Sequence, residues 1–195
     1  MPATHFDATG ITAAILAGGA GMRVGGRDKG LEMLAGEPLI AHVINSLQRQ
    51  AESLLICVNR NPARYAEFAP VCADAMPDFR GPLAGVAAAL TACRTEWLLT
   101  VPVDCPRPPG DLARRLWDAL GAGSAAVAEV GARREPLFAL YRRGLADSAQ
   151  AALQRDLPVR RWQDEIGAVV VDFSDAGAGF TNLNTPEDFR LWKSP

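Results

Sequence analysis

The chain has 195 residues, of which 49% are hydrophobic and 22% are charged, and its formal net charge is -2. This size fits one domain that folds without disulfides or structural metals. The nearly neutral charge argues against a general nucleic-acid-binding protein, and no apolar run is long enough to span a membrane. Neither nucleic acid nor membrane is therefore expected as a partner, and a small anionic ligand fits better.

The chain start and the cysteines favour a cytoplasmic protein. Residues 1–10 lack a basic segment followed by an apolar core, so we expect a flexible N-terminal extension there rather than a signal peptide. Residues 11–195 are expected to form a single domain. The four cysteines are too far apart for a zinc motif or a disulfide framework, which indicates reduced thiols. They are Cys57, Cys72, Cys93 and Cys105.

Strand and helix patterns alternate along the chain from residue 11. Short apolar runs mark strands, whereas apolar residues at helical spacing, or a proline at the first turn, mark helices. In chain order the expected elements are a strand at 11–16, a helix at 38–51, a strand at 54–58, a helix at 63–68, a strand at 71–73, a helix at 81–93, a strand at 97–101, a helix at 111–120, strands at 125–130 and 137–141, a helix at 145–155, a strand at 168–173 and a helix at 185–192. This alternation predicts a Rossmann-like α/β three-layer sandwich with a mostly parallel mixed sheet.

The segment that follows the first strand has the composition of a phosphate-binding loop. Residues 16–30 contain six glycines, two arginines and one lysine. Glycine lets the backbone approach a ligand closely, and successive N–H groups can then line an anion site. The loop fits neither common type, because Lys29 is not followed by Ser or Thr and the third glycine of G-x-G-x-x-G falls on Val24. A solvated surface turn is the alternative.

Polar residues follow several expected strands and should meet at one edge of the sheet. They are the loop that carries Arg23 and Lys29, then Asn59, Asp74 and Asp104. In open α/β sheets, ligands bind outside the carboxyl ends of the strands. Arg23 and Lys29 are candidate phosphate ligands, and Asp104 is a candidate Mg²⁺ ligand, since Mg²⁺ needs only one or two carboxylates. Asp74 could be a second metal ligand or could contact the nucleotide.

Local chemistry explains some of the later motifs and leaves others open. Thr185 is an expected N-cap, with Asp188 as its capping-box acid. That cap does not explain Asn182 and Asn184, which alternate just before it. Gly81 stands at the start of an expected helix whose first turn contains a second glycine. A ligand could approach the N-terminus of this helix closely. Residues 133–136 are expected to form a hairpin-like loop, with only a weak indication that they bind an anionic second substrate.

Taken in order, these segments resemble the molybdenum cofactor guanylyltransferases. The matching segments are Leu16-Ala17-Gly18-Gly19, Arg23, Gly25-Gly26, Asp28-Lys29-Gly30, Asn59-Arg60, Asp74, residues 81–85, residues 102–106 and residues 182–187. The first motif alone is shared by many nucleotidyltransferases, whereas the ordered set is more specific and covers the chain from about residue 11. The resemblance implies a glycosyltransferase-A-like nucleotidyltransferase fold. It also implies Mg²⁺-dependent transfer of GMP from GTP to molybdenum-bound molybdopterin, with release of pyrophosphate.

The resemblance also implies roles for single residues. Leu16, Ala17 and Gly18 would contact guanine, and the Gly18-Gly19 pair is similar to the guanylyl enzymes rather than to their cytidylyl relatives. Lys29, Asp74 and Asp104 would bind the nucleotide or the metal. Asn182 and Asn184 would lie on the side of the site that binds the pterin. One departure is Cys57, where some members carry an Asn that contacts the nucleotide; that contact is then absent or made by Asn59.

These implications define the expected reaction and its alternatives. Arg23, Lys29 and Asp104 are the expected catalytic residues, and no protein nucleophile is required. The expected partners are GTP and molybdopterin cofactor, together with cofactor-inserting or acceptor molybdoenzyme proteins, and the chain is expected to be a monomer or a weak homo-oligomer. The alternatives are a cytidylyl- or sugar-1-phosphate nucleotidyltransferase, or a non-catalytic GTP-binding protein that delivers the cofactor.

Overall fold

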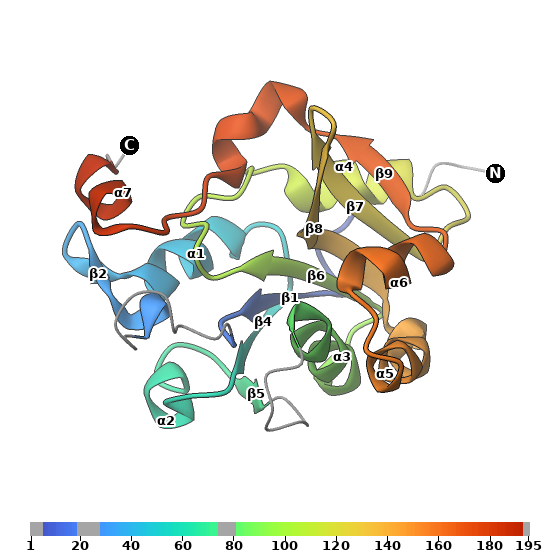
Figure 1. The fold of residues 1–195 in the computed structure, drawn as a ribbon, viewed down its shortest axis with the longest axis horizontal. Coiled ribbons are helices and arrows are strands. Elements are labelled where there is room, and N and C mark those ends of the chain that lie inside the picture. The colour runs from blue at the N-terminus through green and yellow to red at the C-terminus, as the bar shows by residue number, and fades with distance from the viewer. Residues whose placement is uncertain (1–5, 19–27, 74–80, 193–195) are drawn as a thin grey trace.

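A seven-stranded sheet forms the centre of the molecule (Figure 1). The computed structural model describes residues 6–18, 28–73 and 81–192. The strands lie in the order β5-β4-β1-β6-β8-β7-β9. Their bounds are Ile11–Leu16 for β1, Ser53–Val58 for β4, Val71–Ala73 for β5, Trp97–Pro102 for β6, Ala125–Val130 for β7, Arg133–Arg142 for β8 and Val169–Asp172 for β9. A separate hairpin pairs β2, Met33–Leu34, with β3, Glu37–Pro38.

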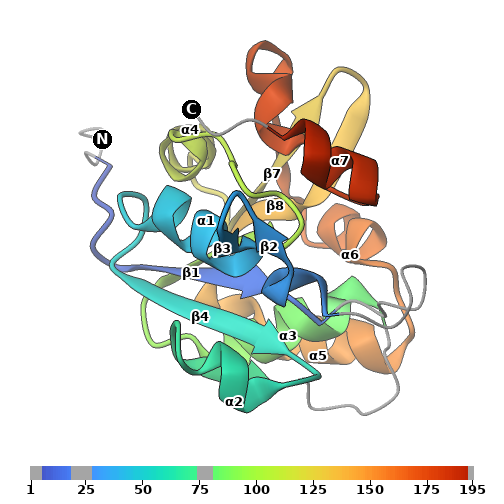
Figure 2. The same cartoon turned by 90° about the vertical axis from the view of Figure 1, so that its left-hand side faces the viewer.

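The sheet is mixed but mostly parallel, as expected. β1 pairs in parallel with both β4 and β6, β4 with β5, and β7 with β9. β8 alone runs antiparallel, between β6 and β7. Figure 2 shows the arrowheads of β1 and β4 at the same side of the molecule. The carboxyl ends of the parallel strands therefore share one edge of the sheet.

Helices cover both faces of this sheet, and each face has its own hydrophobic core. Side chains of β1 alternate, so that Ile11, Ala13 and Ile15 pack on one face and Ala14 packs on the other. The first face is covered by α1 (Leu39–Leu47), α2 (Pro62–Tyr65) and α4 (Leu112–Ala119). The second is covered by α3 (Pro82–Ala92), α5 (Ala146–Gln154) and α6 (Val159–Glu165). Among the described residues, no helix combines the length and the apolar character that a membrane crossing requires.

Shorter helical segments complete the described chain. Three of them are 3-10 helices, η1 at Lys29–Leu31, η2 at Arg143–Leu145 and η3 at Ser174–Phe180, and the last α-helix is α7 at Pro186–Leu191. Part of the expected N-terminal extension is described: the Phe6 ring meets the Trp117 ring edge-on at a centroid distance of 6.4 Å.

Two sequence-based expectations need correction. Residues 133–136 are not a loop, because β8 begins at Arg133 and the hairpin turn is Gly131-Ala132. Gly131 has a φ of 58°, a conformation suited to a two-residue hairpin turn. The first residues of β8 are charged, so the pattern of apolar residues does not predict that the strand begins here. The second correction is α6, which had not been expected; it begins after Pro158 and is too short for a clear helical period.

A buried glutamine fastens the segment that follows β6. The Gln50 side chain is 3% exposed. Its Nε2 donates to the carbonyl oxygens of Ser46 at 3.1 Å and Pro109 at 3.0 Å, and its Oε1 accepts from the N–H of Ala113 at 3.0 Å. Gln50 thereby joins the end of the α1 region to residues 109–113.

Replacing Gln50 with Ala should lower the free energy of unfolding by about 2 kcal/mol, because buried backbone groups of Pro109 and Ala113 lose their partners. Urea denaturation followed by circular dichroism measures this change. Gln48→Ala is the matched control, since Gln48 is exposed two residues earlier. Equal losses in the two variants would contradict the anchoring role of Gln50.

Candidate active site

The candidate site lies at the carboxyl edge of the parallel strands. Pairing continues just beyond the strand ends, where the N–H of Ala17 donates to the carbonyl of Cys57 at 2.8 Å. On the other side of β1, the N–H of Val103 donates to the carbonyl of Leu16 at 3.1 Å. These bonds bring the residues that follow β1, β4 and β6 to one edge, as the rule for open α/β sheets predicts.

Lys29 joins three distant segments of the chain at this edge. Its Nζ donates to Asp104 Oδ2 at 3.1 Å and to Asn184 Oδ1 at 2.7 Å. The side chains of Lys29 and Asp104 are 26% and 22% exposed, so the pair is partly shielded but open to a ligand. Three residues proposed from the sequence therefore form one hydrogen-bonded cluster.

Asp104 has a spare ligand atom. Its Oδ2 accepts from Lys29, whereas its Oδ1 is buried and has no hydrogen-bond partner among the described residues. The described residues include no group of three or more His, Cys, Asp or Glu side chains placed to hold a metal. One free carboxylate oxygen still fits a hard divalent cation whose other ligands come from substrate phosphates and water.

The segment 182–184 is held against Asp104 by its backbone. The N–H of Leu183 donates to the carbonyl of Asp104 at 2.8 Å, and the buried Leu183 side chain packs with Leu34 and Leu39. Asn182 and Asn184 flank this anchor. The Asn182 Oδ1 is buried and accepts no hydrogen bond within the described part of the chain, so it can accept one from a ligand.

A capping box fixes the backbone at Asn184. The predicted cap is confirmed: the N–H of Asp188 donates to Thr185 Oγ1 at 3.2 Å, and the N–H of Thr185 donates to Asp188 Oδ2 at 2.7 Å. The N–H of Asn184 donates to the same Oδ2 at 2.7 Å. These two backbone donors hold the pKa of Asp188 below its ordinary value. The cap thus orients the residue that binds Lys29.

A hollow of about 410 Å³ opens beside the Lys29 cluster. Its lining consists of Val130, Arg133, Glu135, Gly177, Phe180, Thr181, Asn182 and Asn184. Glu135 is 8% exposed, and Arg133 Nε donates to its Oε1 at 2.7 Å. Sequence reasoning assigned these two residues to a loop; their alternation on β8 would have placed them on one face of a strand.

Gly18 and Asn59 meet where β1 and β4 end. Asn59 Nδ2 donates to the carbonyl of Gly18 at 3.4 Å. A Cβ atom on Gly18 would lie 3.1 Å from that nitrogen, so a larger residue would press on the contact. The Cys57 side chain packs instead in the core, with its Sγ 2.9 Å from Cys72 Sγ on β5.

Of the remaining residues proposed from the sequence, three are described by the structure and three are not. Leu16 ends β1 beside the first turn of α3, where a Cβ on Gly85 would be 3.4 Å from Leu16 Cδ2, whereas Ala17 follows β1 and packs against the core on the other face of the sheet. Gly81 precedes α3 with a φ of 75°, which explains the glycine without a ligand. The other three, Gly19, Arg23 and Asp74, lie outside the described residues.

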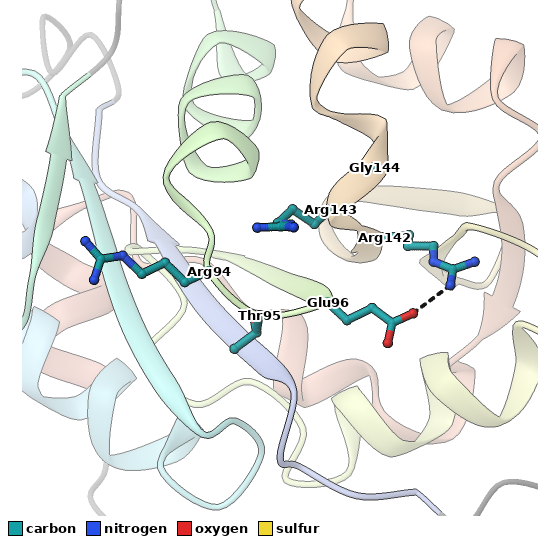
Figure 3. Close-up of a pocket in the computed structure, with 6 residues that line it drawn as sticks. All are labelled: Arg94, Thr95, Glu96, Arg142, Arg143 and Gly144. Atoms are coloured by element: carbon teal, nitrogen blue, oxygen red, sulfur yellow. Dashed lines mark hydrogen bonds and ion pairs between the residues drawn. The ribbon is translucent and has the colours of Figure 1, made fainter.

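A second hollow of about 330 Å³ lies at the other edge of the sheet (Figure 3). It is lined by Arg94, Thr95, Glu96, Arg142, Arg143 and Gly144, where β6 begins and β8 ends. Arg142 is paired with Glu96 at 2.7 Å, and the figure shows Arg94 directed away from the other lining residues. Its place opposite the strand carboxyl ends makes it the weaker candidate for a nucleotide.

Comparisons of sequence identify proteins related to this chain along most of its length. Residues 13–169 match the model of the MobA-like NTP transferase domain. A molybdenum cofactor guanylyltransferase from Serratia proteamaculans is 43% identical over 191 residues, which cover 97% of this chain and 95% of that protein. One from Polynucleobacter asymbioticus is 44% identical, with 93% and 94% covered.

Solved structures show the same fold at lower identity. Molybdopterin-guanine dinucleotide biosynthesis protein A from Archaeoglobus fulgidus has a TM-score of 0.74 and 24% identity, covering 92% of this chain and 95% of that one. The 2-C-methyl-D-erythritol 4-phosphate cytidylyltransferase from Thermus thermophilus has a TM-score of 0.65 and 16% identity, with 91% and 95% covered. The fold is therefore that of the nucleotidyltransferases.

The lowered pKa of Asp188 predicts that the cap stabilises the protein only above acidic pH. Because the folded-state pKa lies below the unfolded one, the contribution is complete above about pH 5 and is lost as pH falls through the folded value. Thermal unfolding should give wild type a higher Tm than Asp188→Ala at pH 7, and this difference should shrink steadily as the pH is lowered below about 5. Glu187→Ala in the same turn is the control; a constant Asp188 difference across this pH range would contradict the prediction.

Proposed function

The chain belongs to the MobA-like NTP transferase family, with the molybdenum cofactor guanylyltransferases as its relatives, and on that premise we propose that it transfers GMP from GTP to molybdenum-bound molybdopterin. The products are the guanine dinucleotide form of the cofactor and pyrophosphate. The observation that carries the proposal is the cluster of Lys29, Asp104 and Asn184 at the carboxyl edge of the sheet. It supplies a cation, a free carboxylate oxygen and an amide at one place.

GTP would lie along the ends of β1 and β4. In this proposal Leu16, Ala17 and Gly18 contact the guanine, and Asn59, through its bond to Gly18, holds that backbone in place. Gly19, Asp74 and Gly81 are assigned to the same nucleotide. The close Gly18–Asn59 approach supports this assignment, because it keeps side chains away from the place where a base would stack.

The reaction is an in-line displacement at the α-phosphorus of GTP. An oxygen of the terminal phosphate of molybdopterin forms a new bond to this phosphorus, and the bond to the bridging oxygen of the β-phosphate breaks. Pyrophosphate leaves with the bonding electrons. Lys29 and Arg23 offset the negative charge on the phosphates, which is the main task of the protein in such a transfer.

Asp104 would hold Mg²⁺ through its unpartnered Oδ1. When bound there, the ion would supply positive charge that offsets the negative charge of the leaving pyrophosphate. Lys29, on the other carboxylate oxygen, keeps Asp104 oriented before the substrate arrives. This preorganisation lowers the cost of arranging charges during the reaction.

The second substrate would occupy the hollow beside Asn182 and Asn184. Bound there, beside Lys29, the acceptor phosphate would lie near the nucleotide. The unpartnered Oδ1 of Asn182 and the shielded carboxylate of Glu135 are acceptors that suit the N–H groups of a pterin ring. These groups support a polar heterocycle, rather than an apolar molecule, as the occupant.

Pyrophosphate release with molybdopterin cofactor and each of GTP, CTP, UTP and ATP tests the proposed reaction. We expect turnover with GTP, dependent on Mg²⁺, and much slower release with the other nucleotides. Equal turnover of CTP and GTP would contradict the guanylyl assignment and favour a cytidylyl enzyme. Tight GTP binding without any turnover would favour a GTP-binding delivery protein.

Asp104→Ala and Lys29→Ala should each lower kcat by about 10²- to 10³-fold, the scale of one lost electrostatic group in an active site. The measurement is steady-state pyrophosphate release, with thermal unfolding to verify the fold. Asp111→Ala is the matched control, because Asp111 lies on the same segment after β6 and, within the described part of the chain, its carboxylate forms an ion pair with Arg114 at 3.1 Å rather than with Lys29. An unchanged kcat in Asp104→Ala would remove this residue from the proposed mechanism.

A further inference from the structure

The segment from the end of β4 into α2 contacts the chain between β1 and η1 at two places, Gly18 and Asp28. Asn59 binds the carbonyl of Gly18, the last described residue before position 19. Asn61 and Tyr65 bind Asp28, the first described residue after position 27. One short piece of chain therefore fastens both flanks of the loop segment that precedes Lys29.

Both carboxylate oxygens of Asp28 accept hydrogen bonds from this segment. Its Oδ2 accepts from Asn61 Nδ2 at 2.9 Å, and its Oδ1 accepts a short hydrogen bond from the Tyr65 hydroxyl. Asp28 occupies the N-cap position of η1, yet its side chain makes no capping bond. The usual structural reason for an aspartate at a helix start is thus absent, and its partners are on α2 instead.

Tyr65 also constrains the residue on the other side of Lys29. A Cβ atom on Gly30 would lie 2.4 Å from the Tyr65 hydroxyl oxygen and 3.0 Å from Val103 Cγ2. Gly30 is therefore enclosed between Tyr65 and the residue that precedes Asp104. Tyr65 contacts both chain neighbours of Lys29, through Asp28 by a hydrogen bond and through Gly30 by packing.

We propose that Tyr65 is a positioning residue for Lys29, and that Asn61 shares this role. Together they hold residues 28–30 so that the Lys29 ammonium reaches both Asp104 and the phosphates of the nucleotide. The proposal rests on the role proposed above for Lys29 in binding GTP. It assigns a function to a buried tyrosine and an exposed asparagine that no motif in the sequence singled out.

The state of the Tyr65 hydroxyl suits a permanent donor. The side chain is fully buried, and burial together with the Asp28 carboxylate raises its pKa far above the ordinary value. The hydroxyl consequently keeps its proton throughout the pH range in which enzymes are assayed. A hydrogen bond to a charged acceptor is among the stronger ones in proteins, so its loss should be measurable.

A double-mutant cycle tests whether Tyr65 acts through Lys29. Tyr65→Phe should lower kcat/KM and weaken the binding of Mg²⁺–GTP, each by about tenfold, because Asp28 loses a donor. In a Lys29→Ala background the same change should alter both quantities less than about twofold. Tyr141→Phe is the control, since Tyr141 is equally buried and hydrogen-bonded to Gln163 away from the site. Equal effects of Tyr65→Phe in both backgrounds would overturn the proposal.

A charge exchange tests Asn61 independently. Asn61→Asp places a second carboxylate beside Asp28, and the like charges should repel each other and lower GTP affinity by about tenfold. Asp also tolerates the left-handed backbone at this position, where φ is 49°. Adding Asp28→Asn puts an amide donor at position 28 opposite the new carboxylate at position 61. The affinity for GTP should then return to within about threefold of wild type. Failure of this rescue in a protein with wild-type thermal stability would count against the proposal.

The two readouts separate this inference from the proposed function. Coupling between Tyr65 and Lys29 in GTP binding, without any transfer to molybdopterin, would support the inference and contradict the proposed reaction. Normal transfer with independent effects of Tyr65 and Lys29 would support the reaction and overturn the inference.

Discussion

The ammonium of Lys29 is the point on which the site depends. It is shared between Asp104, which follows β6, and Asn184, which precedes α7, so segments 75 and 155 residues away from it in sequence converge on one nitrogen. An ion pair about a quarter exposed contributes little to stability. Its value is geometric, because it orients one carboxylate oxygen and leaves the other free. The cap at Asp188 and the contacts of Asp28 both restrict where this lysine can lie.

Much of this arrangement could be predicted from the sequence, because it follows from strand ends and turn chemistry. Apolar runs place the parallel strands, and the parallel topology brings Lys29, Asn59 and Asp104 to one edge. The Thr185 cap is readable from its residue types alone. What could not be predicted depends on long-range packing. Glu135 belongs to a strand whose first residues are charged, and Tyr65 reads as an ordinary core aromatic.

The two halves of the site are built on different principles. The half that we propose binds the nucleotide follows β1 and β4, where Gly18 and Asn59 are close because parallel pairing fixes their register. The other half depends on the segment 173–185, which includes η3 and is held in place by the bond from Leu183 to Asp104 and by the cap at Asp188. A short backbone attachment is enough there because Leu183 is buried against Leu34 and Leu39. The sheet therefore positions Gly18 and Asn59, whereas the Leu183 bond and the Asp188 cap position Asn182 and Asn184.

The reversed direction of β8 has a consequence for how such enzymes can diversify. An antiparallel strand presents its beginning, not its end, at the edge where the parallel strands finish. The β7–β8 hairpin tip, with Arg133 and Glu135, therefore lies in the wall of the hollow, yet it contributes none of the described contacts of Gly18, Lys29 or Asp104. Hairpin tips tolerate substitution and changes in length. With the hollow assigned to the acceptor, as proposed above, substitutions in this tip would change which acceptor binds while the residues proposed to bind the nucleotide stay the same.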